Sequence, residues 1–164
     1  MRKGFTLIEL LAVVLIVSIL TSISLPQYRK SVERARVAEA RQMLPAIYDA
    51  CDRIVVENQC SSWYACRNLL TFDKLDVSLK GKKPTTGNQN VQWETNNFTY
   101  VLIPASKMVR AEMRKGRWHN DDTGRGVFIY YNGHAFSCSA SNLTGTKKQE
   151  ACKMLDFTKT DQGE

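Results

Sequence analysis

The stretch that decides the fold is MRKGFTLIELLAVVLIVSILTSISLP, residues 1–26. Two cations and a glycine come first, and the run from Phe5 to Leu25 is then apolar almost throughout, with the single carboxylate of Glu9 near its start. A helix of this length rises by about 1.5 Å per residue and spans roughly 30 Å, the thickness of the hydrocarbon core of a bilayer. The sequence therefore predicts a membrane-spanning helix.

Glu9 argues against two simpler interpretations of this segment, a secretory signal and a plain membrane anchor. A secretory signal has a shorter apolar core followed by a small-residue cleavage site, which the small residues of Ser18–Ser24 could supply. The apolar run is too long for that class, and Glu9 would lie inside it. A plain single-span anchor explains the length but leaves a charge that costs roughly 2.5–3.5 kcal/mol at a bilayer centre. We therefore expect Glu9 to have a partner.

The orientation of the span does not follow from the flanking charges. Cytoplasmic ends of membrane helices usually carry an excess of lysine and arginine. Here cations lie on both sides of the apolar run, at Arg2, Lys3, Arg29, Lys30, Arg34 and Arg36.

The residues from Lys3 to Leu10, KGFTLIEL, resemble the processing site of type IV prepilins and pseudopilins. Pro26, in the context LPQY, resembles the family as well. The resemblance implies that a prepilin peptidase cleaves between Gly4 and Phe5 and methylates the new amine of Phe5. It also implies that Glu9, at the fifth mature position, acts in assembly.

The chemistry of this processing agrees with an assembly role for Glu9. Cleavage turns the amide nitrogen of Phe5 into an amine, which stays cationic after methylation. Within one helix this amine and Glu9 are four residues apart and could pair. The resemblance favours a pair between Glu9 of one subunit and Phe5 of its neighbour, which would also set the register between subunits.

The helix is predicted to continue beyond the membrane, because 27–57 contains good helix formers and no glycine. One apolar stripe follows helical spacing, with Pro26 and Pro45 expected to bend or loosen the helix. The ion pairs expected on the other faces are Arg29/Glu33, Arg36/Glu39 and Asp49/Arg53. The members of the stripe are Ala40, Met43, Ile47, Ala50, Cys51 and Ile54.

A sheet is predicted after a connection that contains one possible short helix, Tyr64 to Leu70. Strands are expected at 98–103, at 109–113 and in a hairpin of 127–131 with 134–138 around an Asn132-Gly133 type I′ turn. The fold class is α+β, a long N-terminal helix packed on a roughly four-stranded antiparallel sheet, which is pilin-like. We divide the chain into a leader (1–4), a transmembrane and assembly helix (5–25), its amphipathic continuation (26–57) and a globular head (58–164).

Five cysteines and no C-x-x-C pair favour disulfides over a zinc site in an exported chain. The resemblance implies a bridge between Cys138 and Cys152 that closes a C-terminal loop. For the other three we favour Cys51–Cys60 with Cys66 unpaired. The pairs Cys51–Cys66 and Cys60–Cys66 remain open.

Catalytic, metal and cofactor sites find little support, and we predict that the chain is not an enzyme. His134 follows a turn, and His119 with Asp121 and Asp122 is better explained by a turn than by a metal site. Basic residues cluster at Lys80/Lys82/Lys83, at Arg110/Arg114/Lys115/Arg117 beside Trp118, and at Lys147/Lys148. We interpret them as solvated surface, and binding of single-stranded nucleic acid is the less favoured alternative.

The resemblance implies a structural subunit of a type IV pilus-like fibre, formed from a precursor in the bacterial inner membrane and then held in a cell-surface or periplasmic fibre. Its expected partners are copies of itself, the prepilin peptidase and the pilus or secretion assembly machinery. The alternatives are a pseudopilin of a type II secretion system, a minor pilin, and a membrane-anchored binding protein or enzyme. Adhesion, motility, DNA uptake and secretion are not distinguished by the sequence.

Overall fold

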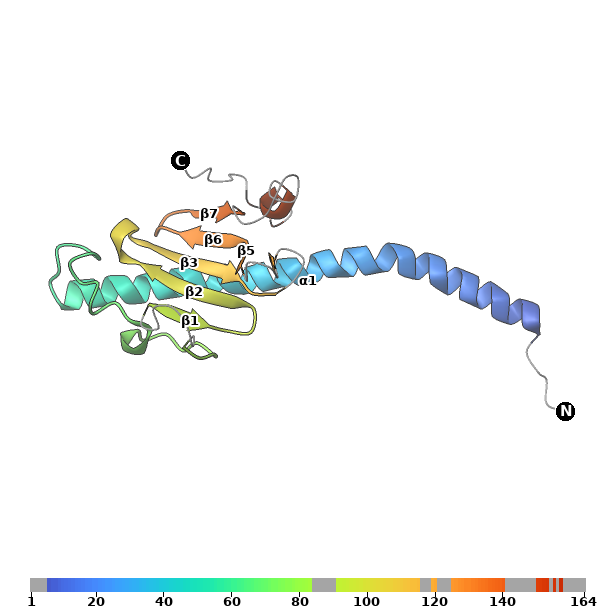
Figure 1. Cartoon of the computed structure of the whole chain (residues 1–164), viewed down its shortest axis with the longest axis horizontal. Helices are drawn as coiled ribbons and strands as arrows, with labels where there is room; N and C mark the ends of the chain where they lie inside the picture. Colours follow the sequence, from blue (N-terminus) through green and yellow to red (C-terminus); the bar gives the residue numbers. More distant parts are fainter. Residues whose placement is uncertain are drawn as a thin grey trace.

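A computed structural model describes residues 6–83, 91–115, 119–120, 125–140, 150–153, 155 and 157. Its main element is the helix α1 (Leu7–Glu57), which is 51 residues long and begins after the N-cap Thr6. Pro26 and Pro45 lie inside it without ending it. Figure 1 shows that one half of α1 lies along a sheet, whereas the other half extends alone, with a gentle curve, to the N-terminal end.

The main sheet has five antiparallel strands in the order β1-β2-β3-β6-β7. They are β1 (Gln92–Glu94), β2 (Phe98–Ile103), β3 (Met108–Met113), β6 (Phe128–Tyr131) and β7 (Phe136–Ser139). The short strands β4 (His119–Asn120) and β5 (Arg125–Gly126) form a separate pair. The described residues also contain two 3₁₀ turns, Phe72–Lys74 and Pro104–Ser106, and a helical stretch at 150–153.

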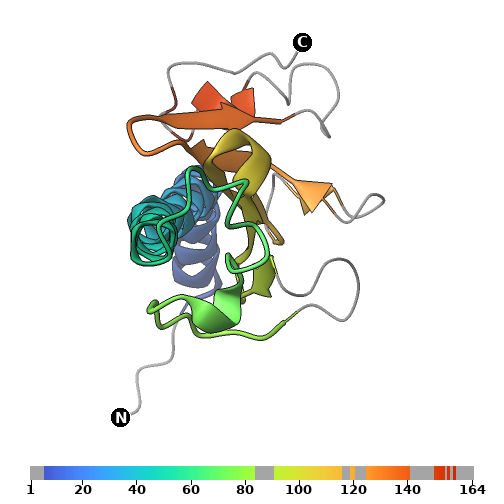
Figure 2. The ribbon, with the colours of Figure 1, turned by 90° about the vertical axis from the view of Figure 1, so that its left-hand side faces the viewer.

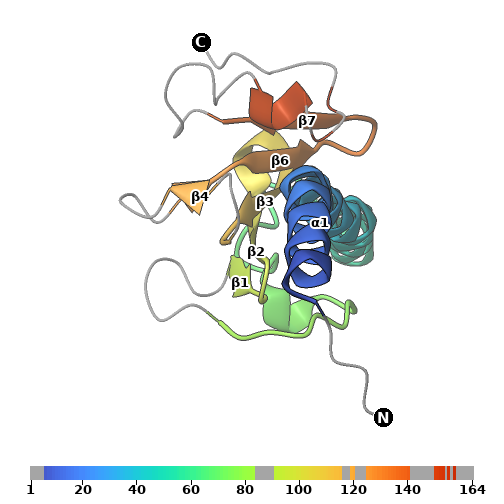
Figure 3. The same ribbon diagram turned by 90° about the vertical axis from the view of Figure 1, so that its right-hand side faces the viewer.

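The core lies between the C-terminal half of α1 and one face of the sheet, which form two layers in the end-on views of Figures 2 and 3. Strand β3 alternates as predicted, with Val109, Ala111 and Met113 buried on the helix side. The helix contributes Ala40 and Ile47, both fully buried. Small residues such as Ala40 let the helix backbone approach the sheet closely, and the larger ones fill the space between the layers.

The predicted α+β class is confirmed, and the sheet has one strand more than the roughly four expected. The additional strand, β1, has only three residues, and none of them is fully buried. A strand that short has too few residues for alternation to stand out in the sequence.

Two local predictions were wrong. The segment from Tyr64 to Leu70 forms turns rather than a helix, with hydrogen bonds that mix three- and four-residue spacings. The β6–β7 connection is a four-residue loop rather than a two-residue type I′ turn. Its first residue, Asn132, accepts hydrogen bonds through its side-chain oxygen from the amides of His134 (3.0 Å) and Ala135 (2.8 Å), and only Gly133 has a positive φ, 92°.

The ion pairs expected on the helix also have different partners. Arg36 pairs with Glu33 at 3.0 Å, and Arg53 forms two hydrogen bonds with Asp76. Glu39 accepts a hydrogen bond from the side-chain amide of Asn97 at 2.7 Å. The helix therefore uses its charged residues partly to hold segments of the head, which spacing along the helix alone does not reveal.

Candidate assembly site on the N-terminal helix

The N-terminal half of α1 exposes almost all of its apolar surface. The large apolar side chains of this half are 48% to 76% exposed, and the most apolar part of the helix is not buried at all. This helix is long and apolar enough to cross a membrane. A contiguous apolar surface of this extent requires a bilayer or other protein chains around it. The exposed residues are Leu7, Ile8, Leu10, Leu11, Val13, Val14, Leu15, Ile16, Val17, Ile19, Leu20, Ile23 and Leu25.

Glu9 lies at the start of this helix and forms a capping box with Thr6. Its Oε2 accepts hydrogen bonds from the Thr6 amide (2.8 Å) and the Thr6 hydroxyl (2.7 Å). The Glu9 amide in turn donates to the Thr6 hydroxyl oxygen at 3.3 Å. This reciprocal arrangement satisfies amides that the first helical turn would otherwise leave without partners.

The capping box leaves half of the Glu9 carboxylate available. Within the described part of the chain, no donor contacts Oε1, and no cation pairs with the carboxylate. Glu9 therefore helps to cap the first turn of α1 and presents an acceptor at the end of the apolar surface. Thr6 was not among the predicted site residues, although the T-x-x-E spacing before an apolar run is a readable signature of a capping box.

Gly4 and Phe5, the predicted cleavage and methylation residues, lie outside the described residues. The described chain begins one residue later, at Thr6. The proposed contact between Glu9 and the Phe5 amine is therefore still a prediction.

The cysteines differ from the favoured pairing in one respect. Cys60 is bonded to Cys66, with 5.8 Å between their Cα atoms, so the expected Cys51–Cys60 bridge is wrong. Cys51 is a free, fully buried thiol. Burial, with a smaller contribution from the neighbouring charge of Asp52, raises the pKa of this thiol to about 12. Cys51 therefore behaves as a small core residue.

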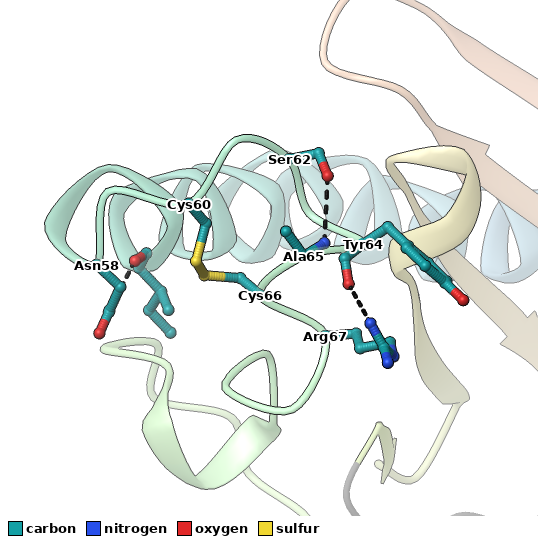
Figure 4. The surroundings of a disulfide bond; sticks show 8 residues. Asn58, Cys60, Ser62, Tyr64, Ala65, Cys66 and Arg67 are labelled. Carbon is teal, nitrogen blue, oxygen red and sulfur yellow. Dashed lines mark hydrogen bonds between the residues drawn. A yellow bond between two sulfur atoms is a disulfide. The ribbon is translucent and has the colours of Figure 1, made fainter.

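The Cys60–Cys66 bridge closes a loop at the end of α1 that is distant from the apolar N-terminal half of the helix (Figures 1 and 4). Trp63 anchors this loop, because its ring is buried against Tyr48 and its Nε1 donates to Asp52 at 2.6 Å. Tyr64 points outward, 57% exposed, with the Arg67 guanidinium 4.5 Å from its ring centroid.

The second disulfide joins Cys138 on β7 to Cys152, the pair that the resemblance implied. The residues after Cys152 reach the helix, because Arg41 donates to the backbone oxygen of Leu155 at 3.2 Å and lies 4.6 Å from the ring centroid of Phe157. The bridge therefore holds the C-terminal segment where α1 can contact it.

The described residues include no group of three or more histidine, cysteine or carboxylate side chains that could hold a metal ion. Asp121 and Asp122 lie outside the described residues, as do Arg117, Trp118, Lys147 and Lys148. Two cations of the predicted basic surface are engaged within the head: Arg110 lies over Phe128 and near Glu112, and Arg114 contacts Glu94 at 3.1 Å.

Comparisons with known proteins agree with this geometry. The family described as "Prokaryotic N-terminal methylation motif" matches residues 1–25. A fimbrial protein of Pseudomonas aeruginosa is 40% identical over 58 residues, which are 35% of this chain and 38% of that protein. The type IV major fimbrial protein FimA of Dichelobacter nodosus is 34% identical over 77 residues, 44% of this chain and 49% of that protein.

A third relative, the type IV major pilin protein PilE1 of Neisseria gonorrhoeae, is 52% identical over 40 residues, 24% of each chain. In each of these cases the match spans less than half of the relative's length. No solved structure matches the chain. The chain thus carries the prokaryotic N-terminal methylation motif on an exposed apolar helix. Over its N-terminal part the chain is similar to type IV fimbrial and pilin proteins.

Proposed function

We propose that this chain is a structural subunit of a type IV pilus-like fibre, made as a membrane precursor and assembled through its N-terminal helix. The observation that carries the proposal is the combination of an apolar half-helix without any described tertiary contact and a carboxylate at its start. The first feature demands a membrane or a bundle of helices, and the second gives that bundle a polar contact that depends on register.

The proposed sequence of events begins with the leader, residues 1–4, in place. A prepilin peptidase cleaves the Gly4–Phe5 bond and methylates the Phe5 amine. Residues 5–25 then leave the bilayer of the inner membrane and enter the fibre core. Residues 26–57 carry the head, residues 58–164, to the fibre surface outside the cell or in the periplasm.

Glu9 is proposed to pair with the Phe5 amine of a neighbouring subunit during this transfer. The capping box supports this role, because Thr6 already supplies two donors to one carboxylate oxygen. Such hydrogen bonds offset part of the cost of keeping a charge in an apolar environment. The oxygen Oε1 stays available for the incoming cation, and the bonds to Thr6 hold the carboxylate in a defined orientation.

A pilus subunit is favoured over a pseudopilin of a type II secretion system by the names of the relatives. These proteins are a fimbrial protein, a major fimbrial protein and a major pilin. The shared region is the N-terminal part of the chain, which is the part that the proposal uses for assembly.

The test is the chemical state of the native protein in its own cells. Intact-mass and N-terminal peptide analysis should give a mature chain that begins at Phe5 and carries one added methyl group, and that chain should be recovered in sheared fibres. A mature N-terminus near Ser22 or Ser24 would instead indicate secretory cleavage and would reject the proposal.

A further inference from the structure

The seven residues between the apolar segment and the head, Pro26–Val32, form a neck in which every side chain is exposed except that of the half-exposed Val32. The first buried helix residue is Glu33, which is only 6% exposed. At about 1.5 Å per residue the neck is roughly 10 Å long, so it separates the head from the end of the apolar surface. Three of its members, Tyr28, Arg29 and Lys30, are consecutive and exposed.

The charges of this neck are not neutralised within the described part of the chain. No described carboxylate forms an ion pair with Arg29 or Lys30, whereas Arg36, one turn further on, pairs with Glu33. Two adjacent cations without partners therefore lie immediately beyond the apolar surface. Such a pair of exposed cations can attract an anionic partner, and its position along the helix distinguishes it from other exposed cations of the head, such as Lys80 and Lys82.

The position of these cations along the helix identifies the partner. Tyr28, Arg29 and Lys30 lie three to five residues beyond Leu25, which is about 4.5–7.5 Å along the axis. The headgroup layer of a bilayer begins at the end of the hydrocarbon core and is about 5–7 Å deep. The three side chains thus reach the depth of lipid phosphates when the apolar segment spans the membrane. Tyr28, 68% exposed, belongs to the residue type enriched at this interface.

A cavity against the same face supports this assignment. It has a volume of about 780 Å³, and its lining includes the apolar side chains of Leu25 and Pro26 as well as the cations Arg29 and Lys30. Glu33 and Arg36 also line it, and these two form an ion pair with each other. Apolar side chains beside two cations match the junction between the acyl chains and the phosphate of a phospholipid.

We propose that the neck binds the phosphates of anionic phospholipids in the leaflet on the head side of the membrane. The inference rests on the proposed function to the extent that it requires the apolar segment to span a bilayer. The bound lipids hold the subunit at a defined depth and are released when the helix leaves the membrane. This binding would also explain why cations lie on both sides of the apolar segment, because the neck cations would be paired with lipid phosphates.

The experiment uses the full chain in a nonionic detergent, titrated with phosphatidylglycerol or with phosphatidylcholine, and counts bound lipids by native mass spectrometry. The double variant Arg29→Gln/Lys30→Gln is compared with Lys80→Gln/Lys82→Gln, which removes the same charge from exposed positions on the head. Arg2 and Lys3 are the same in all three proteins. Each cation near a charged leaflet contributes about fivefold in affinity, so the neck variant should lose about 25-fold in its preference for phosphatidylglycerol.

Retention of the preference in the Lys80→Gln/Lys82→Gln variant and its loss in the neck variant support the proposal. Equal preference in the two variants overturns it, as does a parent chain that does not prefer phosphatidylglycerol. A neck variant with normal lipid preference but fibres that fall apart in salt would assign the cations to a neighbouring subunit instead. A chain that prefers phosphatidylglycerol but is never cleaved at Phe5 would reject the proposed function and leave this inference standing.

Discussion

At the scale of single residues, Glu9 has a local role in the capping box with Thr6, and we propose an intermolecular role for it in assembly. Its bonds to Thr6 explain why a carboxylate is tolerated at the start of an apolar helix, because the N-terminal end of a helix stabilises negative charge. The same bonds leave the carboxylate partly unsatisfied. The carbonyl oxygen of a glutamine at this position can accept the same two hydrogen bonds, but the neutral side chain cannot form an ion pair.

We predict that Glu9→Gln lowers fibre yield without reducing the amount of protein in the membrane. The amine of the neighbouring subunit would meet no anion, and loss of one member of a buried pair typically costs about 3–5 kcal/mol. The assay compares sheared fibres with total membrane protein in cells where this is the only major subunit. Glu57→Gln, an equal change at the exposed end of the same helix, is the control. Normal fibre yield for Glu9→Gln would contradict the proposed pairing of Glu9 with the Phe5 amine of a neighbouring subunit.

Cys51 differs from the other cysteines because it is a free thiol and the other four form disulfides. Its pKa near 12 means that roughly one thiol in 10,000 is ionised at about pH 8, and the thiolate is the form that reacts with alkylating agents. We predict that iodoacetamide labels no cysteine of the native, unreduced protein and labels Cys51 alone once the protein is unfolded without reductant. Peptide mapping by mass spectrometry reads both results. A labelled Cys66 in unfolded, unreduced protein would contradict the Cys60–Cys66 bridge.

At the scale of elements, the long helix and the central strands could be predicted from sequence because their patterns extend over many residues. The alternation of β3 and the apolar stripe of α1 both correspond to buried faces. The stripe already contained Cys51, and a cysteine on the inward face of a helix is more often a core residue than half of a bridge. Giving more weight to that pattern would have favoured Cys60–Cys66.

Short elements and loops were the features that the sequence did not indicate. The strand β1 exists because Trp93 lies opposite Tyr100 in a register with β2, and no local pattern marks so short a strand. The β6–β7 loop has four residues because the Asn132 side chain accepts hydrogen bonds from the amides that follow it. The Asn-Gly dipeptide alone would have favoured a two-residue type I′ turn. The proposed assembly residues could be read as a motif, and the T-x-x-E spacing could also have indicated the capping box of Thr6 and Glu9.

The β6–β7 loop contributes to the core as well as joining two strands. Gly133 has a φ of 92°, and a methyl group there would come within 2.6 Å of the Tyr48 hydroxyl oxygen. We predict that Gly133→Ala lowers the free energy of unfolding by at least about 1 kcal/mol, from the cost of a positive φ alone. Urea unfolding followed by fluorescence measures the change. The exposed neighbour His134→Ala should be nearly neutral, and equal stability of the two variants would contradict the close approach.

At the scale of the whole molecule, the two halves of α1 have different surroundings, although they form one continuous helix. From Glu33 onward the helix is part of the core of the head, and its buried residues form one cluster with the sheet. Before Pro26 the described residues show no burial at all. The stability of the head should therefore be insensitive to changes in the first half, whereas membrane insertion should depend on that half alone.

We predict that Ile16→Lys and Ile47→Lys have opposite effects. Ile16 is 57% exposed in the middle of the apolar segment, whereas Ile47 is fully buried against the sheet. A lysine at position 16 adds about 2.5–3.5 kcal/mol to the cost of insertion, so the variant should leave the membrane fraction while its head keeps the parent melting temperature in detergent. A lysine at position 47 places an unpaired charge in the core, so the head should unfold although the apolar segment still enters the membrane. Because the two substitutions are identical and lie on the same helix, helix propensity cannot explain a difference between them. A lower melting temperature for the head of Ile16→Lys would show that the two halves are coupled and would contradict their independence.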